Sequence, residues 1–160
     1  MLIDEMGKIG KSIDWKGGIM KYDEFIAKVR KRARLTSNEE AERATRATLQ
    51  TIAERIGHAE ANDLAAQLPD ELAMYLRPLY ADGEERFSLS EFFRRVGERE
   101  QVSPMEADYH ARIVLALLAE VVTIGEINDV RARLPAEFAR LFSVENEGEV
   151  PELGRIADSE

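Results

Sequence analysis

The sequence predicts an all-α protein, a helical bundle of about eight helices formed by two pseudo-symmetric tandem repeats. Three observations lead to this prediction: an internal repeat, helix-start signals at matching places in both halves, and apolar residues at helical spacing without strand-like alternation. The composition of the 160 residues, 44% hydrophobic and 33% charged, is that of a globular chain.

The internal repeat runs through most of the chain. Tyr22–Phe25 aligns with Leu89–Phe92, and further matches follow in the same order. The best-preserved block pairs Glu60–Pro69 with Glu126–Pro135. We therefore divide the chain into a flexible N-terminal arm at 1–20, repeat 1 at 21–80, repeat 2 at 86–144, packed with repeat 1 as one domain, and a disordered acidic tail at 145–160.

Helix starts are marked by capping boxes, in which a hydroxyl accepts from a backbone N–H and a glutamate three residues on reaches back to the cap. The boxes are Thr36-x-x-Glu39, Ser88-x-x-Glu91, Ser103-x-x-Glu106 and Thr123-x-x-Glu126. The predicted helices are 22–34, 37–56 and 58–68 in the first half and 89–101, 104–122 and 124–134 in the second. A short final helix begins at Pro69 and at Pro135, since proline ends one helix and starts the next.

The helix predicted at 104–122 is apolar nearly all round. One stripe, from Ala107 to Val122, has the spacing of a buried helix face. A second apolar stripe runs along another side of the same helix. It either packs on the other half of the protein or forms a subunit or partner interface. Its members are Ile113, Leu117, Val121 and Ile124.

The N-terminal arm adds one further candidate contact. It holds Trp15, the single tryptophan, among four glycines, which disfavour a helix. We interpret the arm as a flexible extension, with docking through Trp15 as the alternative. The candidate interface is thus the second stripe together with Trp15.

No catalytic chemistry is predicted. The chain has no cysteine, which excludes disulfides, thiol nucleophiles and thiolate metal sites. His58 and His110 lack metal-ligand spacing and are interpreted as surface or partly buried residues, and the common hydrolase and nucleotide-binding motifs are absent. We therefore expect a protein that is not an enzyme, with no catalytic, metal or cofactor-binding residues and no cofactor.

Carboxylates that match between the two halves have structural interpretations. Glu60 and Glu126 are explained as capping-box residues at helix starts. Asp63 and Asp129 lie one turn before a polar residue, an ordinary pairing on an exposed helix face.

The charge of the chain limits its partners. A formal net charge of -9 disfavours phosphate backbones and anionic membrane surfaces. No apolar run reaches the ~20 residues that span a bilayer, and residues 1–10 lack the apolar core of a signal peptide, so we expect a cytoplasmic protein without membrane contact. The contrary signal is a basic patch, interpreted as a solvated face or, alternatively, as a nucleic-acid contact. The patch consists of Lys28, Arg30, Lys31 and Arg34.

Four segments carry a family resemblance: Tyr22–Phe25, Glu39–Ala47, Asp63–Pro69 and Phe87–Phe92. On these residues, and over about 20–144, the chain resembles a bacterial family known as domain of unknown function 2267. The resemblance implies an all-helical cytoplasmic protein and supplies no activity, cofactor or catalytic residue. The predicted function is a non-enzymatic protein–protein interaction module, with a protein partner or as a homodimer. The alternative is a nucleic-acid-associated protein that uses the basic patch.

Overall fold

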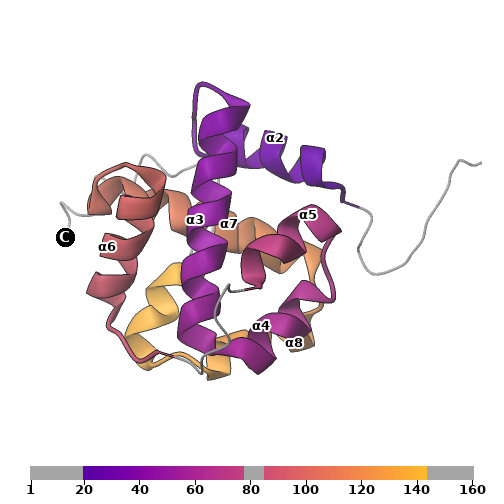
Figure 1. The fold of residues 1–160 in the computed structure, drawn as a ribbon, viewed down its shortest axis with the longest axis vertical. Helices are drawn as coiled ribbons and strands as arrows, with labels where there is room; N and C mark the ends of the chain where they lie inside the picture. Colours follow the sequence, from indigo (N-terminus) through magenta and orange to yellow (C-terminus); the bar gives the residue numbers. More distant parts are fainter. Residues whose placement is uncertain (1–19, 78–84, 144–160) are drawn as a thin grey trace, which may run out of the picture.

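The computed structural model describes residues 20–77 and 85–143, and within these ranges all regular elements are helices, with no strand (Figure 1). The all-α prediction is therefore confirmed for this part of the chain, while Trp15, the rest of the predicted arm up to residue 19 and the whole predicted tail lie outside it. None of the described helices is both long enough and apolar enough to cross a bilayer. The elements are α2 (Tyr22–Arg32), α3 (Asn38–Ile56), α4 (His58–Ala65), α5 (Asp70–Ala73), η1 (Met74–Leu76), α6 (Leu89–Glu100), α7 (Pro104–Val121), α8 (Ile124–Ala132) and η2 (Ala136–Phe142).

The two described ranges follow the same order of helices. A helix of 11 residues, one of 19 and one of 8 in the first range correspond to helices of 12, 18 and 9 residues in the second. In each range a short helix follows a proline, Pro69 or Pro135. This order is the one that the alignment of the two halves predicts.

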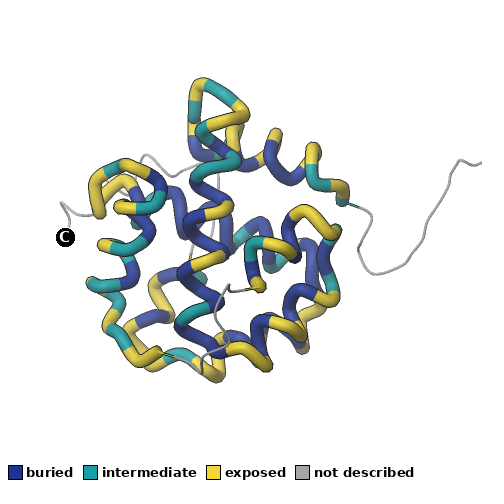
Figure 2. The backbone as a smooth tube through the Cα atoms, viewed as in Figure 1, coloured by how far each residue is buried: buried dark blue, intermediate teal, exposed yellow. Residues whose placement is uncertain are grey.

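The two long helices form the centre of the molecule. α3 and α7 pack on each other, α6 packs on both, and α2 lies across one end of α3 (Figure 1). α4 and α8 lie side by side at the other end. Figure 2 shows buried residues along the inner sides of the helices and exposed residues on their outer sides, as expected when each helix covers one apolar face.

Contacts on several sides of α7 explain its apolar character. α2, α3, α6 and η2 all pack on it. Ile113 and Leu117 are fully buried and Val121 is 4% exposed, and Ile113 packs on Ala33. The hypothesis of an interface along the second stripe is therefore corrected for these three residues, which belong to the core. Only Ile124, at the start of α8, is exposed, with 77% of its surface accessible.

The caps of the long helices agree with the predicted signals to within one residue. Ser103 and Glu106 form the predicted reciprocal capping box of α7. At α3 the cap is Ser37, one residue later than predicted, and its hydroxyl accepts from the N–H of Glu40. The carboxylate of Glu40 in turn accepts from the N–H and the hydroxyl of Thr36. Ser37 can replace Thr36 as the cap because the pair Ser37 and Glu40 has the same three-residue spacing as the pair Thr36 and Glu39.

Candidate functional site

Three carboxylates meet where α4 and α8 lie side by side (Figure 1). Glu60 is in the first turn of α4, and Glu126 and Asp129 are on α8. One oxygen of each carboxylate lies within 4.8 Å of the other two. Glu60 and Glu126 are each only 6% exposed, whereas Asp129 is exposed. We refer to these three residues as the acidic site.

The local sequence explains how both glutamates come to lie inside. Gly57 has φ of 94°, which residues with a Cβ rarely adopt, and this lets the chain turn from α3 directly into α4. At α8 the hydroxyl of Thr123 accepts from the N–H of Glu126, but the N–H of Thr123 donates to Oε1 of Gln67 at 2.9 Å. The predicted capping box is thus half formed, and the carboxylate of Glu126 lies against Glu60 instead.

The acidic site concentrates negative charge with little compensation. Burial, followed by a hydrogen bond to Glu60 and the charges of Glu60, Asp63 and Asp129, raises the pKa of Glu126 to about 8. The Oε2 atoms of Glu60 and Glu126 are buried without a hydrogen-bond partner. One cationic group is near, since Nε of Arg133 lies 3.6 Å from Oε1 of Glu60. Such an arrangement can hold a proton between two carboxylates or bind a cation.

The sequence interpretation missed this site because it gave each residue a local role. Glu60 and Glu126 were assigned to caps, and Asp129 to an exposed helix face. The signal that could have found them is their position, since the two glutamates occupy the same place in the two aligned halves. Only the packing of α4 on α8 shows that these places are adjacent.

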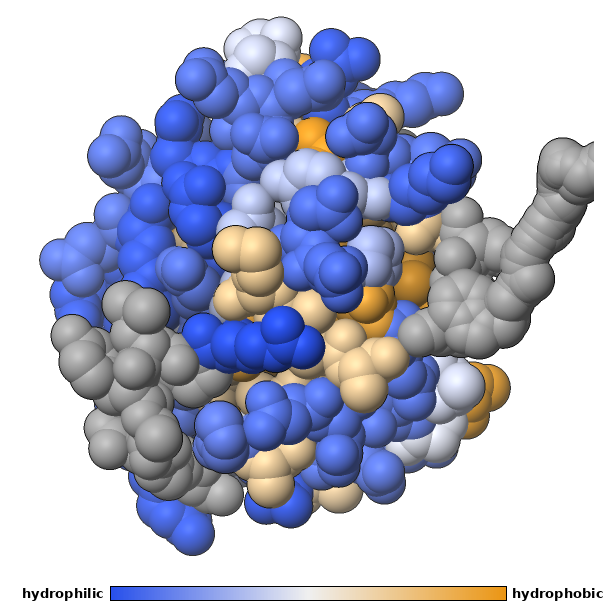
Figure 3. Space-filling model, turned by 45° about the vertical axis from the view of Figure 1, so that its right-hand side comes forward, coloured by the Kyte–Doolittle hydropathy of each residue, from blue (hydrophilic) through white to orange (hydrophobic). Residues whose placement is uncertain are grey.

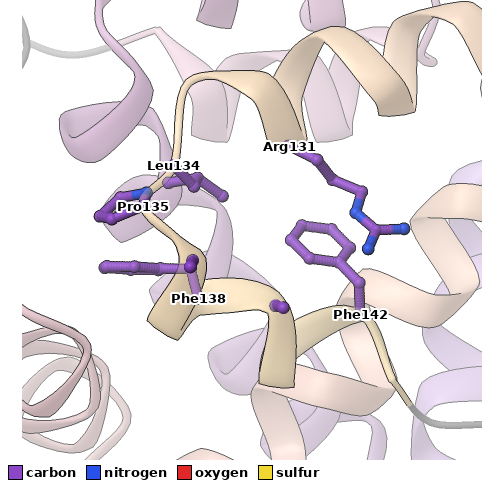
Figure 4. A pocket seen from close by; sticks show the side chains of 7 residues that line it. Arg131, Leu134, Pro135, Phe138 and Phe142 are labelled. Carbon is purple, nitrogen blue, oxygen red and sulfur yellow. The ribbon is translucent and has the colours of Figure 1, made fainter.

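A small pocket lies between α8 and η2 (Figure 4). The guanidinium of Arg131 is 5.2 Å from the centre of the Phe142 ring on its wall. The pocket volume is about 110 Å³, whereas small-molecule sites usually measure about 300–1,000 Å³. The pocket is therefore too small for a substrate of ordinary size. Its wall consists of Arg131, Leu134, Pro135, Ala136, Phe138, Ala139 and Phe142.

The predicted basic patch forms the outer face of α2 and the turn after it. All four of its side chains are exposed, on the side of the helix away from the buried Phe25, Ile26 and Val29. None of the four side chains has a hydrogen bond or an ion pair within the described residues. We refer to Lys28, Arg30, Lys31 and Arg34 as the basic face.

The two histidines have different surroundings. His110 is buried, and its Nδ1 is hydrogen-bonded to Oε2 of Glu100, which is buried as well. His110 is more deeply buried than the sequence led us to expect, because α6 packs on α7 at this point. His58 is exposed, and its Nε2 lies 3.2 Å from Nδ2 of Asn62. Within the described ranges neither histidine belongs to a group of potential metal ligands.

Large apolar side chains are exposed at isolated positions of the described surface. Met74, Met105 and Ile124 lie on three different elements. Figure 3 shows one face of the molecule, on which a limited apolar area is bordered by hydrophilic side chains. Single exposed apolar residues are ordinary on soluble domains. The predicted apolar stripe therefore forms no continuous exposed apolar surface within the described residues.

The fold and the acidic site define the class: an all-helical protein whose two described ranges meet at buried carboxylates. The family model described as "Uncharacterized conserved protein (DUF2267)" matches residues 22–141. The chain belongs to this family, and the match includes the acidic site and the basic face. A search of curated proteins found no match.

Proposed function

We propose that the protein is a non-enzymatic helical interaction module that binds an acidic surface of a partner protein through the basic face of α2. The observation that carries this proposal is that four exposed cationic side chains form no ion pair with any of the residues that the structure describes. The chain has 31 acidic residues and 22 Lys and Arg, so intramolecular partners are not in short supply. A face that forms no ion pair within residues 20–77 and 85–143 suits an external anionic partner.

The second described range offers the contrast. On α6, Arg94 bonds to Glu91, and Arg95 bonds to Glu91 and to Glu54. Arg99 bonds to Glu54 at 2.6 Å. Arg95 and Arg99 thus hold α6 against α3, whereas the basic face of α2 has no such role among the described residues.

A protein partner is favoured over nucleic acid for two reasons. The net charge of -9 opposes a phosphate backbone, which is charged at every nucleotide, more strongly than it opposes a local acidic patch on a protein. In addition, the aromatic residues of α2 are turned inward: Phe25 is fully buried and the hydroxyl of Tyr22 bonds to that of Tyr75 at 2.9 Å. The basic face therefore lacks the stacking platforms that single-stranded nucleic acids use.

The non-enzymatic part of the proposal is supported by how the polar groups are used. Arg55, for example, is buried, donates to the carbonyl of Phe87 and lies over the ring of Phe138. The pocket beside η2 is small, and its only ionisable lining residue is Arg131. We also propose that the two halves are pseudo-symmetric repeats, supported by their common order of helices, and that the protein acts in the cytoplasm.

The experiment compares three forms of the full chain. The first is the wild type, and the second has the basic face neutralised by Lys28→Gln, Arg30→Gln, Lys31→Gln and Arg34→Gln. The control carries Arg46→Gln and Arg77→Gln, which are exposed cations outside the basic face. Each tagged form is used to capture partners from nuclease-treated native lysate at low and high salt, and captured proteins are quantified by mass spectrometry.

The proposal expects an acidic protein that the wild type and the control retain, that the neutralised form loses, and that high salt releases, because salt screens exposed charges. Retention of that protein by the neutralised form would contradict the role of the basic face. Salt-dependent retention of nucleic acid in untreated lysate, with no protein, would replace the proposal by the nucleic-acid alternative. Sedimentation of each purified form tests whether the partner is a second copy of the chain.

A further inference from the structure

We propose that the acidic site binds a hard divalent cation, with Ca²⁺ preferred to Mg²⁺, between α4 and α8. Glu60, Glu126 and Asp129 supply the protein ligands. The proposal is independent of the interaction through α2, and it departs from the expectation that the chain has no metal ligands.

The spacing of the oxygens fits such an ion. Two oxygens on opposite sides of Ca²⁺ are separated by about 5 Å, and two on opposite sides of Mg²⁺ by about 4.2 Å. The three carboxylates each offer an oxygen within 4.8 Å of the others. One ion can therefore contact all three oxygens, and Ca²⁺ is preferred because it accepts irregular coordination by carboxylates and water, whereas Mg²⁺ requires a near-ideal octahedron. The exposed position of Asp129 leaves room for water to complete the coordination shell.

The second observation is the state of the buried carboxylates. Glu60 and Glu126 are more than nine-tenths buried, and Oε2 of each lacks a hydrogen-bond partner. Buried polar atoms in folded proteins are nearly always paired. The structural role expected for Glu126, a bond back to the N–H of Thr123, is taken by Gln67 instead. A cation between the two helices would supply these two oxygens with a partner.

The surrounding charges leave a deficit of positive charge. Asp63 on α4 adds to the field at Glu126, as do Glu60 and Asp129. Arg133 is the facing cation, but its side chain is 45% exposed and it approaches Glu60 at 3.6 Å. The excess of negative charge at the site attracts a cation.

Binding would have a structural consequence. Glu60 belongs to the first half of the chain and Glu126 to the second, so one ion would connect the start of α4 to the start of α8. An ion that binds the folded state and not the unfolded state raises the temperature of unfolding. Ca²⁺ is thus expected to act as a clamp between the two halves.

The test uses isothermal titration of the full chain with CaCl₂ and, separately, MgCl₂ at pH 9, where the carboxyl of Glu126 is ionised. Thermal unfolding is followed with and without Ca²⁺. The variants are Glu126→Gln and Asp129→Asn, each of which keeps the shape of the side chain and removes a charged ligand. The matched control is Glu98→Gln, an exposed glutamate on α6.

The proposal expects one Ca²⁺ per chain, weaker Mg²⁺ binding and a rise in unfolding temperature with Ca²⁺. Both variants should lose affinity by ~10-fold or more, because fewer anionic ligands remain, and the control should behave as the wild type. Absence of binding to the folded wild type would overturn the proposal and leave a shared proton as the occupant. Equal binding by Glu126→Gln would overturn it as well.

Discussion

Replacing Glu126 with Gln should stabilise the protein at alkaline pH when divalent cations are removed by a chelator. The pKa of this carboxyl is raised from 4.5 to about 8 in the folded state. The folded state therefore keeps a proton that the unfolded chain has already released. Its stabilising effect is fully present below pH 4.5, decreases as the pH rises, and is lost above pH 8.

The magnitude follows from the size of this change. One pH unit corresponds to about 1.36 kcal/mol, so the ionised form of Glu126 costs the folded state up to about 5 kcal/mol above pH 8. Partial relaxation around the exposed Asp129 reduces the cost, and we expect about 2–5 kcal/mol. Gln carries no charge at any pH and its amide can donate to Glu60. The stability of the variant relative to the wild type should therefore increase as the pH rises from 5 to 9.

Urea unfolding followed by far-UV circular dichroism at each pH from 5 to 9 measures this difference. Glu98→Gln is the control, since its side chain is 70% exposed, and its stability should run parallel to that of the wild type. Glu91, whose pKa is lowered to about 2 by its bonds to Arg94 and Arg95, affects the slope only at lower pH. A Glu126→Gln curve that runs parallel to the wild type, or lies below it at pH 9, would refute the reasoning.

Two further pairs of variants test the packing, each by thermal and urea unfolding. Leu117→Ala should lower the free energy of unfolding by about 2–5 kcal/mol because the side chain is fully buried. Ile124→Ala, at an exposed position, should change it by no more than about 0.5 kcal/mol. Similar effects of the two substitutions would mean that the stripe lies on the surface. Gly97→Ala should cost about 1–3 kcal/mol, since a Cβ would lie 2.8 Å from the carbonyl oxygen of Val102. Gly125→Ala, with nothing within 4 Å of the added Cβ, should stabilise α8 by up to about 1 kcal/mol, and destabilisation there would contradict the open space.

The helical class and most helix boundaries could be predicted because their causes are local. A cap such as Ser103 acts on backbone groups three residues away, and Pro69 and Pro135 end a helix through their own geometry. Errors of one residue, as at Ser37, arise where two neighbouring hydroxyls each have a glutamate at the same spacing. The apolar pattern of α7 likewise showed that both of its sides had to be covered.

What the sequence by itself determined was therefore which residues form helices and which faces of them avoid water. It left open what covers a face, and the tertiary structure decided that Ile113 and Leu117 are covered by the same chain. The sequence also left open where a charged side chain points. Glu126 has the spacing of a capping residue, but its carboxylate lies against Glu60, 66 residues away, because α4 packs on α8. Burial and electrostatic coupling depend on which elements meet in space, and neighbouring residues in the sequence do not specify that.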